Sequence, residues 1–198
     1  MATEPSQPEQ WILASSSPRR RELLERIGVS FRVLTAHTEE ISSATHPAEV
    51  VQDLAMQKAK AVQVLEPDGY IIASDTVVAL DGEILGKPSG KLENRAMLER
   101  LSGRIHTVYT GIALLTPSTE KVEFDATTVQ FRHLSSAELD WYAGSGEGLD
   151  KAGGYGIQEK GMLLIERIEG DFFNVMGLPT VRLLHMTRAL GLELVPGL

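Results

Sequence analysis

The stretch WILASSSPRRRELL, residues 11–24, contains a strand, a short loop and the first turns of a helix. Residues 11–14 form an apolar run typical of a short buried strand. Ser17 is predicted at the N-cap and Pro18 at the first helical position, with the helix ending near Gly28. A strand joined to a helix by a short loop is the unit from which α/β sheets are built.

The arginines of this stretch differ in their predicted surroundings. Arg21 has Glu25 four residues on, a spacing that pairs side chains on an exposed helix face. Arg19 and Arg20 instead have Leu23 and Leu24 at that spacing, on the stripe that turns inward. Two cations at a helix N-terminus oppose the helix dipole, whereas an anion is favoured there. The pattern by itself is explained equally by a phosphate site and by a solvated basic turn.

Helices and strands alternate along the rest of the chain, which predicts an α/β class with a mixed sheet. Asp81-Gly82 predicts a tight hairpin turn, Ser135 with Glu138 predicts a capping box, and residues 144–156 form a glycine-rich loop. The predicted strands are 31–34, 70–80, 83–85, 106–115, 122–131 and 162–168, and the other predicted helices are 47–65, 91–101, 135–142 and 179–190.

Composition restricts the classes of function. The 198 residues suit one domain, with or without two lobes. A formal net charge of −8 argues against a general nucleic-acid binder, and the absence of cysteine excludes disulfides and cysteine nucleophiles. Residues 1–10 are expected to be a disordered tail, without the apolar core of a signal peptide. No apolar run suits a membrane span, so a cytoplasmic protein is expected.

Lys58 lies on an apolar stripe of the predicted helix 47–65, whereas Lys60 lies on the opposite side. A lysine on a core-facing stripe must reach water along its stem or meet a counter-charge. Both readings stay open. The stripe is made by Val51, Leu54, Ala55, Val62 and Leu65.

Asp75 interrupts an otherwise apolar strand. Aspartate is disfavoured in strands and is rarely buried without a partner. A metal, a cation or a catalytic role would explain it, and a structural carboxylate is the alternative. Glu39 or Glu40 could supply a second carboxylate for Mg²⁺, although ordinary surface charge also explains these two residues.

Two further segments carry candidate ligand-binding residues. Lys87 follows the hairpin in Gly86-Lys87-Pro88, a position where a surface lysine is the alternative. Residues 149–158, LDKAGGYGIQ, allow close backbone approach, and Gln158 offers a donor and an acceptor suited to a base edge. A tight connection without a ligand is the alternative reading of this loop.

Taken together, these segments resemble the Maf family of nucleotide pyrophosphatases, also called septum formation proteins. The resemblance runs from residue 11 through nearly the whole chain and includes residues 14–20 (ASSSPRR), 74–78 (SDTVV), 86–88 (GKP), 101–103 (LSG), 110–111 (TG), 150–158 (DKAGGYGIQ) and 174–179 (NVMGLP). It implies a single Maf-like domain over residues 11–198, with an elongated mixed sheet, flanking helices and two lobes with a cleft between them, as in inosine-triphosphate pyrophosphatases.

The resemblance implies a metal-dependent hydrolase that cleaves a nucleoside triphosphate to the monophosphate and pyrophosphate. Asp75 would be the general base or a ligand, with Glu40, of Mg²⁺, Mn²⁺ or Co²⁺. The substrate would be held by Ser15, Arg19, Arg20, Lys58, Thr76, Lys87 and Gln158.

Arg19, Thr76 and Gln158 are similar to the branch of the family that acts on dTTP and UTP. Glu159-Lys160 departs from the glycine-rich continuation common after Gln158. The alternatives are an inosine-triphosphate or 7-methyl-GTP pyrophosphatase, or a non-enzymatic nucleotide-binding regulator of cell division. The expected partner is a small nucleotide, with no nucleic acid and no membrane. The oligomeric state stays open, with a homodimer as one option.

Overall fold

The computed structural model describes residues 7–198, and these residues form a mixed sheet of seven strands flanked by helices. The strand order is β2-β1-β3-β5-β6-β7, with β4 paired to β3. Strand β1 (Trp11–Leu13) is parallel to both β2 (Phe31–Val33) and β3 (Ile71–Leu80), while β4 (Glu83–Leu85) runs antiparallel to β3. The remaining strands are β5 (Ile105–Leu115), β6 (Glu120–Phe131) and β7 (Ile165–Glu169). The predicted α/β class is confirmed.

The chain divides into two compact units. The first takes residues up to Asp75, Thr110–Asp125 and Gly177–Leu198, and the second takes Thr76–Tyr109 and Ala126–Met176. Of the predicted tail, residues 1–6 lie outside the described residues. In the described part, Gln7 Nε2 donates a hydrogen bond to the Gly191 carbonyl, and Gln7 Oε1 accepts one from the Glu193 N–H.

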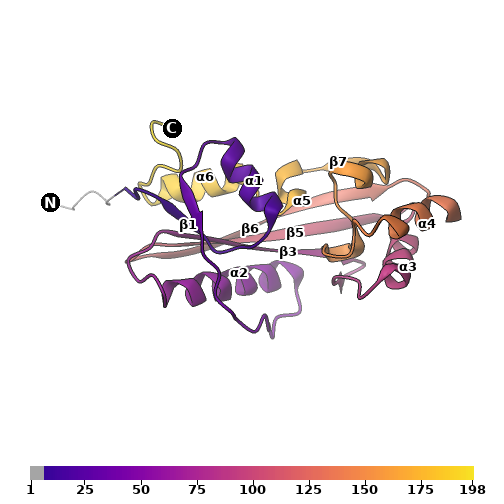
Figure 1. Cartoon of the computed structure of the whole chain (residues 1–198), viewed down its shortest axis with the longest axis horizontal. Coiled ribbons are helices and arrows are strands. Elements are labelled where there is room, and N and C mark those ends of the chain that lie inside the picture. Colours follow the sequence, from indigo (N-terminus) through magenta and orange to yellow (C-terminus); the bar gives the residue numbers. More distant parts are fainter. Residues whose placement is uncertain (1–6) are drawn as a thin grey trace. The chain divides into compact units, whose positions relative to one another are not determined.

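In the first unit, helix α2 (Pro47–Gln63) lies along one face of the strands, and α1 (Pro18–Arg26) and α6 (Thr180–Ala189) lie on the other (Figure 1). Alternate residues of a strand point to the same face of the sheet. The residues that face α2 form an apolar core with the helix. This core contains Ile12, Ala14, Ala55, Ala59, Val62, Ile71, Ala73, Ala113 and Leu115. Leu65, predicted on the same stripe, is mostly exposed because the helix ends at Gln63.

Helix α2 approaches β5 very closely at Gly111. A Cβ added to Gly111 would lie 2.3 Å from the carbonyl oxygen of Val51. No real Cβ comes so near a backbone oxygen, so only glycine permits this helix–strand distance. Val51 is two helical turns before Lys58 on the same face of α2, and the contact therefore also sets the depth of Lys58.

In the second unit, helices α3 (Lys91–Leu101) and α4 (Ser136–Ser145) pack beside β4 and the parts of β3, β5 and β6 that belong to this unit. The core includes Leu98, Leu101, Phe131, Tyr142 and Tyr155. His106 is buried with its Nε2 2.6 Å from the Tyr155 hydroxyl, and burial lowers the pKa of His106 to about 4. It is therefore neutral near pH 7.

Most predicted turns and caps are confirmed. Asp81 and Gly82 both have positive φ in the hairpin, and Ser135 with Glu138 forms the capping box. Ser17 occupies the N-cap of α1, but its side chain makes no capping hydrogen bond. Helix α4 continues to Ser145, which is beyond the predicted end.

The predicted start of the strand 162–168 is wrong. Residues Glu159–Leu163 form the 3-10 helix η2, and β7 begins at Ile165. The short helix α5 (Phe172–Met176) was not predicted. Apolar runs this short give no periodicity that separates a strand from a helical turn.

Gly111→Ala is expected to lower the free energy of unfolding by about 1–3 kcal/mol, because the methyl group forces α2 away from β5. Urea denaturation measures this change. Gly144→Ala is the matched control, since a Cβ at Gly144 meets no atom within 4 Å. It should leave stability unchanged or slightly raised. Equal stability of Gly111→Ala and wild type would contradict the close approach.

Candidate active site

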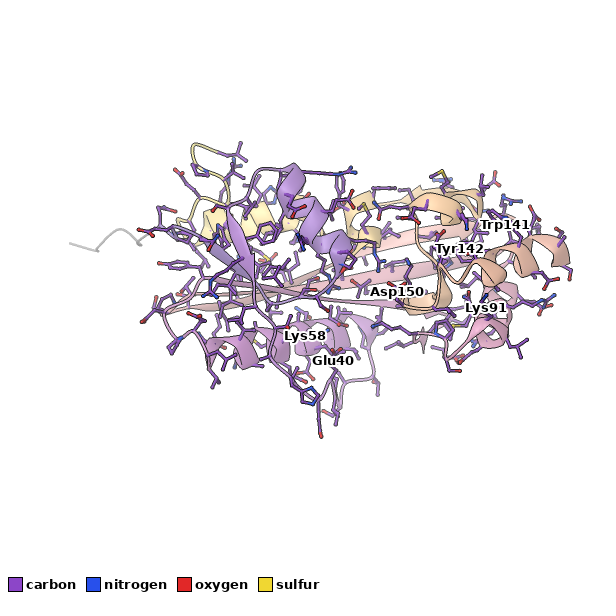
Figure 2. The ribbon with its side chains drawn as sticks, viewed as in Figure 1. Glu40, Lys58, Lys91, Trp141, Tyr142 and Asp150 are labelled. Carbon is purple, nitrogen blue, oxygen red and sulfur yellow. The ribbon has the colours of Figure 1, made fainter. Side chains whose placement is uncertain are left out.

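In the first unit, one lysine joins two carboxylates. The Lys58 ammonium lies 2.5 Å from Asp75 Oδ1 and 3.0 Å from Glu40 Oε2. The Lys58 and Asp75 side chains are only 18% and 12% exposed, whereas that of Glu40 is 52% exposed. Figure 2 shows Lys58 on α2 beside Glu40. The cluster therefore runs from the buried strand to the surface.

The alternation of β3 explains why Lys58 meets Asp75. Ile71, Ala73 and Asp75 point to the face covered by α2. Lys58 lies on the same side of α2 as the buried Ala55 and Ala59. Of the two alternatives that the sequence left open for Lys58, the structure shows the counter-charge, and Lys60 on the other side instead pairs with Glu120.

Glu40, rather than Glu39, supplies the second carboxylate. The segment before α2 is tied to the helix by Gln57, whose Nε2 donates to the Ile41 carbonyl at 2.7 Å. Gln57 and Ile41 are the chain neighbours of Lys58 and Glu40, so one hydrogen bond holds both side chains close together. Glu40 is therefore the glutamate that pairs with Lys58, and its role as a metal ligand stays a prediction.

A second group of contacts surrounds Arg20 on the other face of the sheet. Its guanidinium donates to Ser15 Oγ at 3.0 Å and to the Gly177 carbonyl at 2.7 Å. Ser74 donates to the same carbonyl at 2.9 Å. Since Ser74 and Asp75 are consecutive in a strand, their side chains point to opposite faces. Gly177 thus links α1 to the residue next to Asp75.

The charges of Asp75 and Glu40 also act on Arg20. Burial lowers the pKa of its guanidinium, Asp75 raises it, Arg19 lowers it and Glu40 raises it. An arginine remains charged under all these influences. Arg21 forms an exposed pair with Glu25, as predicted. The two positions thus have the different surroundings expected from the sequence.

Ser74 and Gly177 were not predicted as site residues. Ser74 is fully buried, and a serine inside an apolar strand is a weak signal because its hydroxyl bonds readily to nearby backbone. Gly177 has φ +107, a conformation that favours glycine. Its place in a Met-Gly-Leu-Pro turn was the signal that could have found it.

The second unit carries the three remaining predicted residues. Thr76 points to the same face of β3 as Val78, and Val78 packs against Gly153 of the glycine-rich loop. Lys87 is exposed and follows Gly86, whose carbonyl accepts from the Gly153 N–H at 3.0 Å. Within this unit, the turn that carries Lys87 therefore contacts the loop that carries Gln158.

Glu40 and Asp75 are the residues that could hold a divalent cation. Their oxygens converge on one ammonium group, so the pair already surrounds a positive charge. Mg²⁺ commonly binds through one or two carboxylates and keeps its other positions for water or phosphate. Within residues 7–198, no three His, Asp or Glu side chains gather as a larger ligand set.

The match to the Maf-like protein family covers residues 10–190. The chain belongs to the Maf family. It is 50% identical over 182 residues to a Deinococcus radiodurans protein named dTTP/UTP pyrophosphatase, covering 92% of this chain and 93% of that protein. Proteins of the same name from Symbiobacterium thermophilum and Thermus thermophilus are 46% and 51% identical, covering 96% and 91% of this chain and 98% and 94% of theirs.

Among solved structures, this Maf-family chain is similar to the Ham1 protein of Staphylococcus aureus. The TM-score is 0.47 at 18% identity, over 62% of this chain and 72% of that one. No helix in residues 7–198 is long and apolar enough to cross a membrane.

Arg20→Ala is expected to weaken the binding of inorganic pyrophosphate about tenfold or more, because charge-assisted bonds from the guanidinium to phosphate are lost. Arg19→Ala should act in the same direction. Isothermal titration calorimetry measures both. Arg21→Ala is the matched control and should stay within about twofold, as expected for an exposed i,i+4 pair. An equal loss in Arg21→Ala would mean that the helix faces are wrongly assigned.

Proposed function

We propose that this Maf-family chain is a nucleoside triphosphate pyrophosphatase that hydrolyses dTTP and UTP to the monophosphate and pyrophosphate. The observation that carries the proposal is the Lys58 ammonium held between Asp75 and Glu40. A binding module needs no half-buried carboxylate pair among cations, whereas phosphoryl chemistry needs both kinds of charge. The names of the relatives support this choice of substrate.

Asp75 is the proposed centre of the chemistry. It would accept a proton from the water that attacks the α phosphorus, or hold the metal, or both. Its side chain is largely buried, and its carboxylate forms an ion pair with Lys58. Lys58 therefore neutralises the carboxylate charge before the substrate binds. The proton taken from water would then have an acceptor that the strand holds rigidly.

The cations have the proposed role of holding the triphosphate. Arg19 and Arg20 sit at the N-terminus of α1, where backbone N–H groups and the helix dipole also favour phosphate. The two bonds of Arg20 to Ser15 and Gly177 fix its guanidinium before substrate binds. Lys58 and Lys87 would add charge that stabilises the departing pyrophosphate.

Glu40 and Asp75 would hold Mg²⁺, Mn²⁺ or Co²⁺. When bound, the ion supplies charge neutralisation at the phosphate oxygens. Glu40 is half-exposed and Asp75 buried. We therefore propose Asp75 as the fixed ligand and Glu40 as the adjustable one.

Gln158 and Thr76 have the proposed role of selecting the base. A glutamine amide can accept from N3–H of thymine or uracil and donate to a neighbouring carbonyl oxygen. A site built on such bonds rejects bases that leave its polar groups without partners.

We expect the reaction to take place in the cytoplasm, where these nucleotides are used.

The test is a screen of the purified protein against common and methylated nucleoside triphosphates with Mg²⁺, Mn²⁺ or Co²⁺, detecting pyrophosphate. dTTP and UTP should have the highest kcat/KM, and chelation of the metal should stop turnover. A preference for 7-methyl-GTP or ITP would reject the base assignment alone. Absence of any pyrophosphate release would reject the enzyme and favour a nucleotide-binding regulator.

Asp75→Asn is expected to reduce kcat for dTTP to background and to leave the melting temperature nearly unchanged, because the amide keeps an oxygen facing Lys58 and Glu40 still neutralises the ammonium. Loss of general-base assistance alone costs about 10²–10⁴-fold, so a larger loss indicates a metal role as well. Asp140→Asn is the matched control, since Asp140 forms an exposed pair with Arg95. Retention of most of kcat in Asp75→Asn would reject the assignment.

A further inference from the structure

The loop that carries Gln158 is closed on itself. A Cβ added to Gly161 would lie 1.7 Å from the carbonyl oxygen of Gly156, so the two backbones are in direct contact. Between them, Gln158 is extended and Glu159 has φ +53. Gln158 therefore projects from a short closed loop whose two ends meet.

One carboxylate of the preceding segment binds the far end of this loop. Glu147 Oε1 accepts from the Gly161 N–H at 3.0 Å, and its Oε2 accepts from the Lys160 N–H at 3.1 Å. Glu147 follows directly after Gly146, the left-handed C-cap of α4. Bonds from backbone N–H to a carboxylate are charge-assisted and stronger than neutral ones.

Tyr142 of α4 binds the near end of the loop. Its buried hydroxyl accepts from the Gly156 N–H at 3.1 Å and donates to Glu147 Oε1 at 3.1 Å. Burial raises the pKa of Tyr142, so the hydroxyl keeps the proton that it donates. Figure 2 labels Tyr142 on α4 in the second unit. Tyr142 and Glu147 thus hold the backbone two residues before Gln158 and two residues after it.

We propose that Tyr142 and Glu147 are positioning residues that set the orientation of Gln158 toward the pyrimidine base. The proposal rests on the proposed function, in which Gln158 reads the base. Neither side chain needs to touch the substrate. Each acts through the backbone of the loop, and the hydrogen bond between them makes the two anchors one unit.

Two conservative variants test this proposal. Tyr142→Phe removes only the hydroxyl and leaves the Gly156 N–H without its acceptor. Glu147→Gln keeps the shape but replaces one accepting oxygen with an NH₂ group, so at least one bond to the loop or to Tyr142 is lost. Glu138→Gln is the matched control. This variant changes a carboxylate of α4 that also accepts from a backbone N–H, but its partners are Ser135 and Arg132.

The measurements separate base recognition from phosphate binding. Calorimetry gives the Kd of dTMP, which carries the base, and of inorganic triphosphate, which carries none. Tyr142→Phe and Glu147→Gln should each weaken dTMP binding about tenfold, because a displaced Gln158 loses the equivalent of one hydrogen bond to the base. Both variants should leave triphosphate binding within about twofold. Glu138→Gln should change neither Kd.

A double-mutant cycle with Gln158→Ala tests whether the effect passes through Gln158. In the Gln158→Ala background, Tyr142→Phe and Glu147→Gln should have no further effect on dTMP. Persistence of the full loss in that background, or an equal loss of triphosphate binding, would overturn the proposal in favour of a general structural role. If Glu147→Gln does not fold, Tyr142→Phe carries the test alone.

The same data distinguish this proposal from the proposed function. Wild-type protein that binds dTMP but releases no pyrophosphate from dTTP would reject the enzyme, while the dTMP affinities of the variants still decide the positioning role. Active wild type with unchanged dTMP binding in Tyr142→Phe and Glu147→Gln would reject the positioning role alone. Wild type that binds no dTMP would overturn the positioning role, while pyrophosphate release from dTTP would still decide whether the protein is the proposed enzyme.

Discussion

The ion pair between Lys58 and Asp75 imposes the strictest requirement on this structure. A carboxylate inside an apolar strand loses its hydration, and removing its partner would leave a costly buried charge. Lys58 must therefore lie at a fixed depth beside the sheet and at a fixed point along β3. Helix α2 meets that requirement through the close contact of Val51 with Gly111. Packing that looks purely structural thus controls the position of the charged cluster.

Strand β3 distributes its residues between two tasks. Asp75 points toward α2 and Lys58, while Ser74 points the other way and bonds the carbonyl that also holds Arg20. Asp75 therefore belongs to the carboxylate cluster, and its neighbour Ser74 shares a carbonyl partner with Arg20 at the start of α1. This division follows from the two-residue repeat of a strand, and it explains why a buried serine stands beside the buried aspartate.

The glycine-rich loop shows how a departure from the family pattern is accommodated. Glu159 follows Gln158 where a glycine-rich continuation is common, and it adopts φ +53. A non-glycine residue in that region costs of order 1 kcal/mol or more. The bonds from Lys160 and Gly161 to Glu147 lie immediately after it. These contacts hold the backbone in place directly after the strained residue.

The sequence by itself determined the α/β class, most element bounds, the Asp81-Gly82 turn and the unusual character of Lys58 and Asp75, because these depend on local propensity and periodicity. It also separated Arg20 from Arg21 by their neighbours four residues on. Only the tertiary structure decided that Glu40 rather than Glu39 faces Lys58, that Gly177 joins Arg20 to Ser74, and that Tyr142 and Glu147 hold the loop of Gln158. Most of those contacts join residues far apart in the chain, and all of them depend on how helices, strands and loops pack, which local pattern does not specify.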